Sequence, residues 1–221
     1  MEKSQLSANL DAIAPYAAHF GRPIEQVAKD LDSFAVLLKK WQAVQNLVSR
    51  ETLGSVWQRH FADSIQLMPL LKTSDREFLD FGSGGGFPAL PLAIASKGLD
   101  RHFTLIEPTA RKVSFLRTVS RELDLNVAVI GLRSDQIDSR ETPEPDVITS
   151  RALAAMPLLC TWIAPFFAEK TRAILHKGRE YVDELAESGA EWHHDVVVNN
   201  SDTDPSGVIL TVTNLSRKSV S

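Results

Sequence analysis

The N-terminal third of the chain has the apolar spacing of amphipathic helices. From Pro23, which suits a first helical turn, apolar residues recur every three or four positions and so share one helical face: Ile24, Val27, Leu31, Phe34, Leu38 and Trp41. A second helix is predicted from about Ser55 to Leu71, with its inward positions at Val56, Phe61, Ile65 and Met68. No strand-like run interrupts this region, so we predict an N-terminal helical extension over residues 1–72.

From residue 77 onward, short apolar runs alternate with helical stretches. Strands are predicted at 78–81, 102–107, 126–130, 146–149 and 172–176, and helices at 88–96, 109–123, 155–168 and 180–188. This alternation indicates a parallel sheet with helices on both faces. Two β-branched runs, 195–198 and 208–212, flank a polar turn and predict a final antiparallel pair. The predicted fold class is therefore α/β, a doubly wound and mostly parallel sheet, in a domain spanning residues 73–221.

Composition restricts the class of protein further. With 221 residues, 43% of them hydrophobic, the chain suits one substantial core with an extension. It has no apolar run of membrane-spanning length and no basic region followed by an apolar segment at its start, so we expect a soluble protein that is not exported. Cys160 is the only cysteine, which excludes an intramolecular disulfide and indicates a reducing compartment such as the cytoplasm. His193 and His194 are adjacent in a predicted strand and point to opposite faces, so we predict no metal site.

The net charge of −4 argues against nucleic-acid binding driven by overall charge. Any contact with RNA must therefore come from a local basic surface. The predicted helix 109–123 has one basic side, formed by Arg111, Lys112, Arg117 and Arg121. That side is either an RNA-facing stripe or an ordinary solvated surface.

A glycine-rich loop is the strongest motif in the chain. Residues 79–88 read Leu-Asp-Phe-Gly-Ser-Gly-Gly-Gly-Phe-Pro and lie between a predicted strand and a predicted helix. Glycines let the backbone approach a ligand closely, and the helix N-terminus presents free N–H groups to an anionic group. Ligands of open α/β sheets bind at such junctions. We therefore predict cofactor contacts at Gly82, Gly84 and Gly86.

Two classes of cofactor fit this loop, a dinucleotide and S-adenosylmethionine. The dinucleotide pattern G-x-G-x-x-G fails from Gly82, because its sixth position is Phe87. A looser form is met by Gly84, Gly86 and Ala89. The glycine pattern alone therefore leaves both classes open.

Acidic residues near the loop favour the methyl donor. Glu107 ends the next predicted strand, where a carboxylate binds the ribose hydroxyls of either cofactor. Asp80, beside the loop, suits the ammonium group of a methionine moiety and would repel a pyrophosphate. Ser134 and Asp135 follow the third strand, where they can accept from an adenine amino group, although Asp135 can equally be a surface carboxylate.

Several blocks of sequence extend this interpretation to a family. They are Lys-Trp-Gln-Ala-Val-Gln-Asn-Leu-Val-Ser at 40–49, Arg-His-Phe-Ala-Asp-Ser-Ile at 59–65, the loop at 80–88, Arg-Lys-Val-Ser-Phe-Leu-Arg at 111–117, Thr-Ser-Arg-Ala at 149–152 and Lys-Gly at 177–178. With these blocks the chain resembles the RsmG (GidB) family over nearly its whole length. The two helical blocks before the loop are more specific than the loop, which is common to many methyltransferases.

The resemblance implies a class I, Rossmann-like methyltransferase fold preceded by helices. It implies transfer of a methyl group from S-adenosylmethionine to N7 of a guanine in 16S ribosomal RNA of the small ribosomal subunit, and we expect a monomer. The cofactor contacts that it implies are Gly82, Phe87, Ser134, Asp135 and Arg151, with Glu107 on the ribose by analogy with the wider superfamily.

This chemistry agrees with the residues after the fourth strand. Guanine N7 is unprotonated, so no general base is needed, and acceleration comes mainly from positioning and desolvation. Residues 150–153, Ser-Arg-Ala-Leu, replace the Asn/Asp-Pro-Pro-Tyr/Phe motif of amino-methylating enzymes. We predict that Arg151 is catalytic, through donation to guanine O6 or to a phosphate, and that Arg59, His60 and Lys177 bind RNA phosphates.

Two other functions remain open at this point. One is an NAD(P)- or flavin-dependent oxidoreductase that uses the looser dinucleotide pattern. The other is an RNA-binding scaffold that has kept the fold and lost turnover. Binding of NADH without S-adenosylhomocysteine would indicate the first, and binding of RNA without any cofactor would indicate the second.

Overall fold

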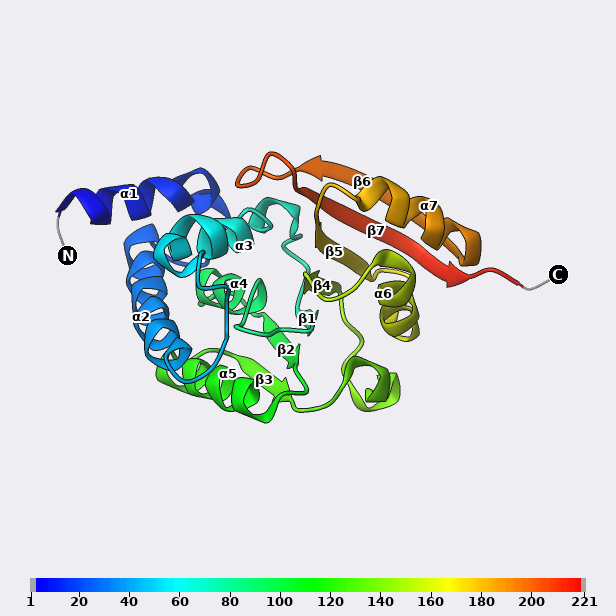
Figure 1. The fold of residues 1–221 in the computed structure, drawn as a ribbon, viewed down its shortest axis with the longest axis horizontal. Helices are drawn as coiled ribbons and strands as arrows, with labels where there is room; N and C mark the ends of the chain where they lie inside the picture. Colours follow the sequence, from blue (N-terminus) through cyan, green and yellow to red (C-terminus); the bar gives the residue numbers. More distant parts are fainter. Residues whose placement is uncertain (1–2, 220–221) are drawn as a thin grey trace.

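The computed structural model describes residues 3–219 and the side chains of residues 7–219. Within them, seven strands form one sheet in the order β3-β2-β1-β4-β5-β7-β6 (Figure 1). The strands are β1 Glu77–Phe81, β2 His102–Ile106, β3 Val127–Ile130, β4 Val147–Arg151, β5 Arg172–Lys177, β6 Trp192–Asn200 and β7 Val208–Arg217. β1 to β5 pair in parallel, and β7 runs antiparallel to both β5 and β6. The predicted doubly wound α/β fold with a final antiparallel pair is confirmed.

Outside residues 55–71, the helices agree with the predicted apolar spacing. They are α1 Lys3–Ile13, α2 Ile24–Gln42, α3 Asp63–Ile65, α4 Ala89–Ala95, α5 Ala110–Glu122, α6 Met156–Ile163 and α7 Tyr181–Glu191. α2 begins directly after Pro23 and buries Val27, Leu31 and Phe34, as the spacing predicted. α6 ends earlier than predicted, because Pro165 lies in a 3₁₀ turn that follows it. In the described part of the chain, no helix is long and apolar enough to cross a membrane.

The prediction of one helix from Ser55 to Leu71 is wrong. A π-helical turn, Trp57–Ala62, precedes the short α3, and a 3₁₀ turn follows at Met68–Leu70. The Ser64 hydroxyl donates to the carbonyl of His60 at 2.7 Å, a bond that competes with regular helix geometry. Interrupted helices of this kind frequently occur at functional sites.

The sheet packs helices on both faces. Phe78 and Phe103 stack at 4.4 Å on the face that carries α2, α4 and α5, whereas Leu79 and Phe81 point to the face of α6 and α7 (Figure 1). Alternate strand residues therefore serve two separate cores, as a period of two requires.

An aromatic cluster joins the N-terminal helices to the glycine loop. Phe34 of α2 lies 5.4 Å from Phe61 and 5.4 Å from Phe87, measured between ring centroids. Phe34, Phe61 and Phe115 are fully buried, and Phe87 is nearly so. Burial of several aromatic side chains in one cluster is strongly stabilising. The cluster fixes the segment 57–65 against the end of the sheet where the loop lies.

Candidate functional site

A cavity of about 750 Å³ opens at the carboxyl ends of β1, β4 and β5. Its walls are the glycine loop, the end of β4 with the segment 152–154 that follows it, the segment 47–63 that leads into α3, and the turn between β6 and β7. This edge is where doubly wound sheets bind ligands. The volume is typical of a site for a small molecule or cofactor.

The glycine loop forms one wall of this cavity. Gly82 has a φ of +70°, and a Cβ atom on it would lie 2.5 Å from the Leu153 side chain, so a larger residue would strain the backbone there. Gly84 has a φ of +54°, and a Cβ on it would meet nothing closer than the Gly82 carbonyl at 3.7 Å. Gly86 lies outside the cavity lining, against the side chains of Leu90 and Leu116. The loop therefore presents Gly82 and Gly84 to a ligand, and Gly86 packs inward.

Glu107 is a buried residue that bonds to the backbone of the glycine loop. It is only 4% exposed, and its two carboxylate oxygens accept from the backbone N–H groups of Gly84 at 3.0 Å and Thr109 at 2.8 Å. Each carboxylate oxygen has further lone pairs, so the group can still accept from ribose hydroxyls. Glu107 is not among the residues that line the cavity.

Asp80 has a buried carboxylate of which only one oxygen is hydrogen-bonded. Its Oδ1 accepts from the Thr149 hydroxyl at 2.6 Å, whereas Oδ2 has no hydrogen-bond partner among the described residues. Burial raises the pKa of Asp80 to about 7, although the hydrogen bond from Thr149 opposes the shift. A buried carboxylate oxygen without a donor fits a cationic ligand group such as an ammonium.

The structure does not bring Ser134 and Asp135 to the cavity wall. Both lie in a 3₁₀ turn, Ser134–Gln136, that follows β3. Asp135 is exposed and pairs with Arg133 at 3.1 Å, which lowers the pKa of the aspartate. Their predicted contact with adenine stays a prediction.

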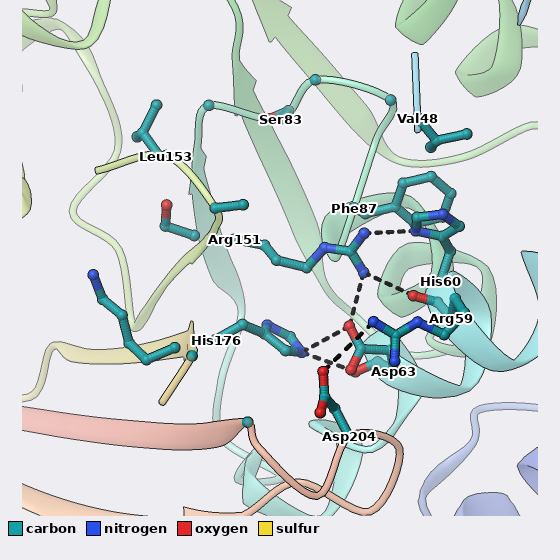
Figure 2. Close-up of a pocket in the computed structure, with 18 of the residues that line it drawn as sticks. Val48, Arg59, His60, Asp63, Ser83, Phe87, Arg151, Leu153, His176 and Asp204 are labelled. Carbon is teal, nitrogen blue, oxygen red and sulfur yellow. Dashed lines mark hydrogen bonds and ion pairs between the residues drawn. The ribbon is translucent and has the colours of Figure 1, made fainter. Parts of the chain in front are cut away.

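Arg151 is held by four contacts at the centre of the cavity (Figure 2). Its Nη1 donates to Asp63 Oδ2 at 2.7 Å and to the carbonyl of Arg59 at 3.3 Å, and its Nη2 donates to His60 Nδ1 at 2.5 Å. The guanidinium carbon lies 5.4 Å from the centroid of the Phe87 ring. Burial lowers the pKa of Arg151, Asp63 opposes this shift, and an arginine stays charged in proteins. Three of its five N–H donors are thus used, which leaves two for a ligand.

His60 is placed differently from what we predicted. It is 5% exposed, stacks on Phe87 at 4.8 Å between centroids, and shares a hydrogen bond of 2.8 Å with the Thr52 hydroxyl. Burial, and then the Arg151 cation, lower the pKa of His60 to about 4. A neutral, buried ring is poorly suited to bind a phosphate, so this placement argues against the predicted direct RNA contact.

Asp63 and His176 line the cavity and were not predicted as site residues. The Asp63 carboxylate binds Arg151 and also accepts from the Thr203 hydroxyl at 2.6 Å, in the turn between β6 and β7. His176 donates from Nε2 to the Asp63 carbonyl at 2.9 Å, and its burial lowers its pKa. A signal for Asp63 was present, because it stands three residues after His60 in the block 59–65, on the same side of a helical turn.

The other predicted phosphate ligands differ in accessibility. The Arg59 side chain is 46% exposed and lies 3.5 Å from Asp204 at the rim of the cavity. The Lys177 side chain is 7% exposed, and its Nζ donates to the Ala154 carbonyl at 2.7 Å and to Glu184 at 2.6 Å. Arg59 can therefore reach a large ligand from outside, whereas Lys177 is part of the wall.

The basic side of α5 extends from this rim. Lys112 lines the cavity, and Arg111, Arg117 and Arg121 are exposed. Among the described residues, no group of His, Cys, Asp or Glu side chains is arranged to hold a metal ion.

Comparison with known proteins gives a consistent result. The model of a family described as "rRNA small subunit methyltransferase G" matches residues 27–204. A protein named "Ribosomal RNA small subunit methyltransferase G" from Cereibacter sphaeroides is 40% identical over 84% of this chain and 89% of its own length. One of the same name from Paramagnetospirillum magneticum is 42% identical over 83% of this chain and 87% of its own length.

Solved structures show the same architecture at low sequence identity. A methyltransferase from Podospora anserina, solved with S-adenosylhomocysteine (SAH), has a TM-score of 0.58 at 10% identity. The match covers 82% of this chain and 87% of that one. At this level of identity the likeness concerns the fold alone, and it agrees with the predicted methyltransferase fold.

Proposed function

Because the chain belongs to the rRNA small subunit methyltransferase G family, we propose that it transfers a methyl group from S-adenosylmethionine to N7 of a guanine in 16S ribosomal RNA. The observation that carries this proposal is the position of Arg151. Its guanidinium has two free donors and lies in the same cavity as the open glycine loop. A binding site for the methyl donor and a cation for the RNA nucleotide thus share one cavity.

The residues near the loop fit S-adenosylmethionine, which supplies a sulfonium methyl group when it is bound. The unpaired Oδ2 of Asp80 suits the ammonium of the methionine moiety. Glu107 has lone pairs for the ribose hydroxyls, and Gly82 and Gly84 let the ligand approach the backbone. Phe87 lines the same cavity, below the Arg151 guanidinium.

The remaining predicted cofactor contacts belong to the proposal as well. Ser134 and Asp135 would bind the adenine end, although the Asp135 carboxylate must first be shared with Arg133 or released from it. Gly86 would act indirectly, since its backbone shapes the turn that presents Gly82 and Gly84.

The chemistry requires positioning and not proton removal. Guanine N7 attacks with its own lone pair, so no side chain has to act as a general base. In this cavity the imidazole of His60 accepts from Arg151, and that of His176 donates from Nε2 to the Asp63 carbonyl. Arg151 holds the nucleotide, and the walls of the cavity exclude water.

Binding of the RNA would begin at the rim. Arg59 and the basic side of α5 are accessible to phosphates, and His60 would act through Arg151. Residues 1–72 would form an extension of the methyltransferase domain 73–221, consistent with the core that α2 shares with the sheet. Action on ribosomal RNA would place the protein in the cytoplasm, and we expect it to work as a monomer.

The proposal is tested by titrating the purified protein with S-adenosylmethionine, followed by incubation of labelled cofactor with 16S RNA or small ribosomal subunits from cells lacking the gene. Mapping of the modified base should show a methyl group on N7 of a guanine. Binding of NADH in place of S-adenosylhomocysteine would indicate an oxidoreductase. Binding of RNA without cofactor binding would indicate an inactive scaffold.

A further inference from the structure

A buried ion pair lies in the wall of the cavity on the side of α7. Lys177 ends β5, and Glu184 stands in the first turn of α7. Both side chains line the cavity, and they are only 7% and 22% exposed. Arg151 and the glycine loop line the same cavity. The pair therefore faces the space in which the proposed reaction takes place.

The hydrogen bonds of this pair leave one acceptor and one donor unused. Glu184 Oε2 accepts from Lys177 Nζ at 2.6 Å and from the backbone N–H of Met156 at 2.9 Å. Glu184 Oε1 has no hydrogen-bond partner in the described part of the chain. Lys177 Nζ uses two of its three N–H groups, on Glu184 and on the Ala154 carbonyl.

We propose that Lys177 and Glu184 read the Watson–Crick edge of the target guanine, an inference that rests on the proposed function. The free N–H of Lys177 would donate to O6, and Glu184 Oε1 would accept from N1–H. Adenine also has an N7 atom, so an enzyme that modifies guanine alone must distinguish the two bases at another edge. Adenine presents a donor at N6 and an acceptor at N1, which is the reverse of what this pair offers.

The geometry of the purine agrees with this assignment. N7 belongs to the five-membered ring, whereas N1 lies on the far side of the six-membered ring. O6 and N7 are neighbours on the adjacent edge, so a base held at N1–H and O6 by Glu184 and Lys177 leaves the N7 lone pair uncovered beside O6, open to the rest of the cavity. Enzymes that modify extruded bases read them by the same edge. Arg151 is then available for the phosphate of the nucleotide.

A purely structural role explains less of what is observed. A buried ion pair contributes little net stability against the cost of desolvation. As a brace for α6, Glu184 needs only Oε2, which bonds the first residue of that helix. The unused Oε1 and the unused N–H are complementary to guanine, and rejection of a base that cannot pair with buried polar groups is strong.

The substitution Glu184→Gln tests the proposal, because it replaces one hydrogen-bond acceptor of the pair with a donor. Lys177 Nζ and the Met156 N–H both donate, so they hold the amide oxygen in the place of Oε2. The amide NH₂ then takes the place of Oε1 and donates to N1 of adenine, where it opposes N1–H of guanine. With the mapped target position carrying guanine or adenine in synthetic RNA, we expect kcat/KM for guanine to fall about tenfold to a hundredfold and the ratio of adenine to guanine to rise by at least as much.

Two controls separate recognition from folding. Glu187→Gln, one turn further along α7 and exposed, should leave both rates unchanged. Thermal unfolding and S-adenosylmethionine affinity of Glu184→Gln report any general damage. An equal loss on guanine and adenine would overturn the proposal, because a merely structural role leaves their ratio constant.

A second experiment uses only the unaltered protein and so does not depend on the variant folding. Inosine keeps O6 and N1–H, so its rate of methylation should be within a few-fold of that of guanine. 2-Aminopurine lacks both groups, so its rate of methylation should be about a hundredfold lower. Equal rates on the three bases would overturn the proposal. If the unaltered protein methylates no guanine N7 in ribosomal RNA, the proposed function itself fails, and that result is distinct from methylation without this pattern.

Discussion

The carboxylate of Asp63 and the guanidinium of Arg151 are 88 positions apart in the chain and 2.7 Å apart in the structure. This bond joins the interrupted helix before the sheet to the end of β4. The side chains are 15% and 19% exposed, so water screens the pair only partly. The N-terminal segment thus orients the cation that we place at the reacting nucleotide.

Replacing Arg151 with alanine should impair methyl transfer. The change removes the two free N–H donors together with the charge, and we expect kcat/KM for the RNA to fall about a hundredfold. Transfer of labelled methyl groups measures this effect. Calorimetric titration with S-adenosylmethionine, as the control, should show a smaller loss. Unchanged transfer would remove Arg151 from the site.

Asp63→Asn should also impair methyl transfer, but less than the replacement of Arg151 with alanine. Asparagine has nearly the same shape and can still accept from Arg151, but it provides no charge to hold the guanidinium. We expect about a tenfold loss in kcat/KM and a fall in unfolding free energy of about 2 kcal/mol, measured by urea denaturation. Asp204→Asn is the matched control, because its partner Arg59 lies 3.5 Å away and is 46% exposed. Equal effects of both substitutions would argue against a positioning role for Asp63.

Much of the fold could be predicted because its signals are local. A parallel strand buried on both faces, such as β5, contains a short apolar run, and α2 shows an apolar stripe at helical spacing. The failure lies at residues 55–71, where apolar residues keep a helical spacing but the backbone widens into a π turn. Hydrogen bonding by Ser64, combined with packing of Phe61 into the aromatic cluster, outweighs that local preference.

The site could be predicted only in part, for a related reason. Gly82 directly follows β1 and Arg151 ends β4, so the rule for open sheets places them at one edge. Asp63 and His176 meet there through a tertiary contact, and the position of Asp63 in the block 59–65 does not predict this partner. The burial of His60 could not be predicted from the sequence either, because an Arg-His pair in a helical segment is typical of an exposed basic surface.

Gly84→Val should abolish binding of S-adenosylmethionine. The position has a φ of +54° and only open space beside it, so a valine side chain would project into the cavity and strain the backbone. We expect at least a hundredfold weaker binding in a calorimetric titration, with a modest fall in melting temperature. Gly54→Val is the control, since a Cβ there meets nothing within 4 Å and the residue does not line the cavity. Normal affinity in Gly84→Val would contradict the assignment of the loop.

Binding of S-adenosylmethionine should depend on pH through Asp80. Its pKa is raised to about 7, and only the ionised carboxylate pairs with an ammonium, so binding must release a proton below that pH. The association constant should therefore rise about tenfold from pH 6 to pH 8 and then level off. His60 does not interfere, because its pKa of about 4 keeps it neutral throughout. Calorimetry in two buffers of different ionisation enthalpy measures the released proton directly. Asp80→Asn should bind more weakly and lose the slope, and a slope that persists in this variant would assign the proton to another group.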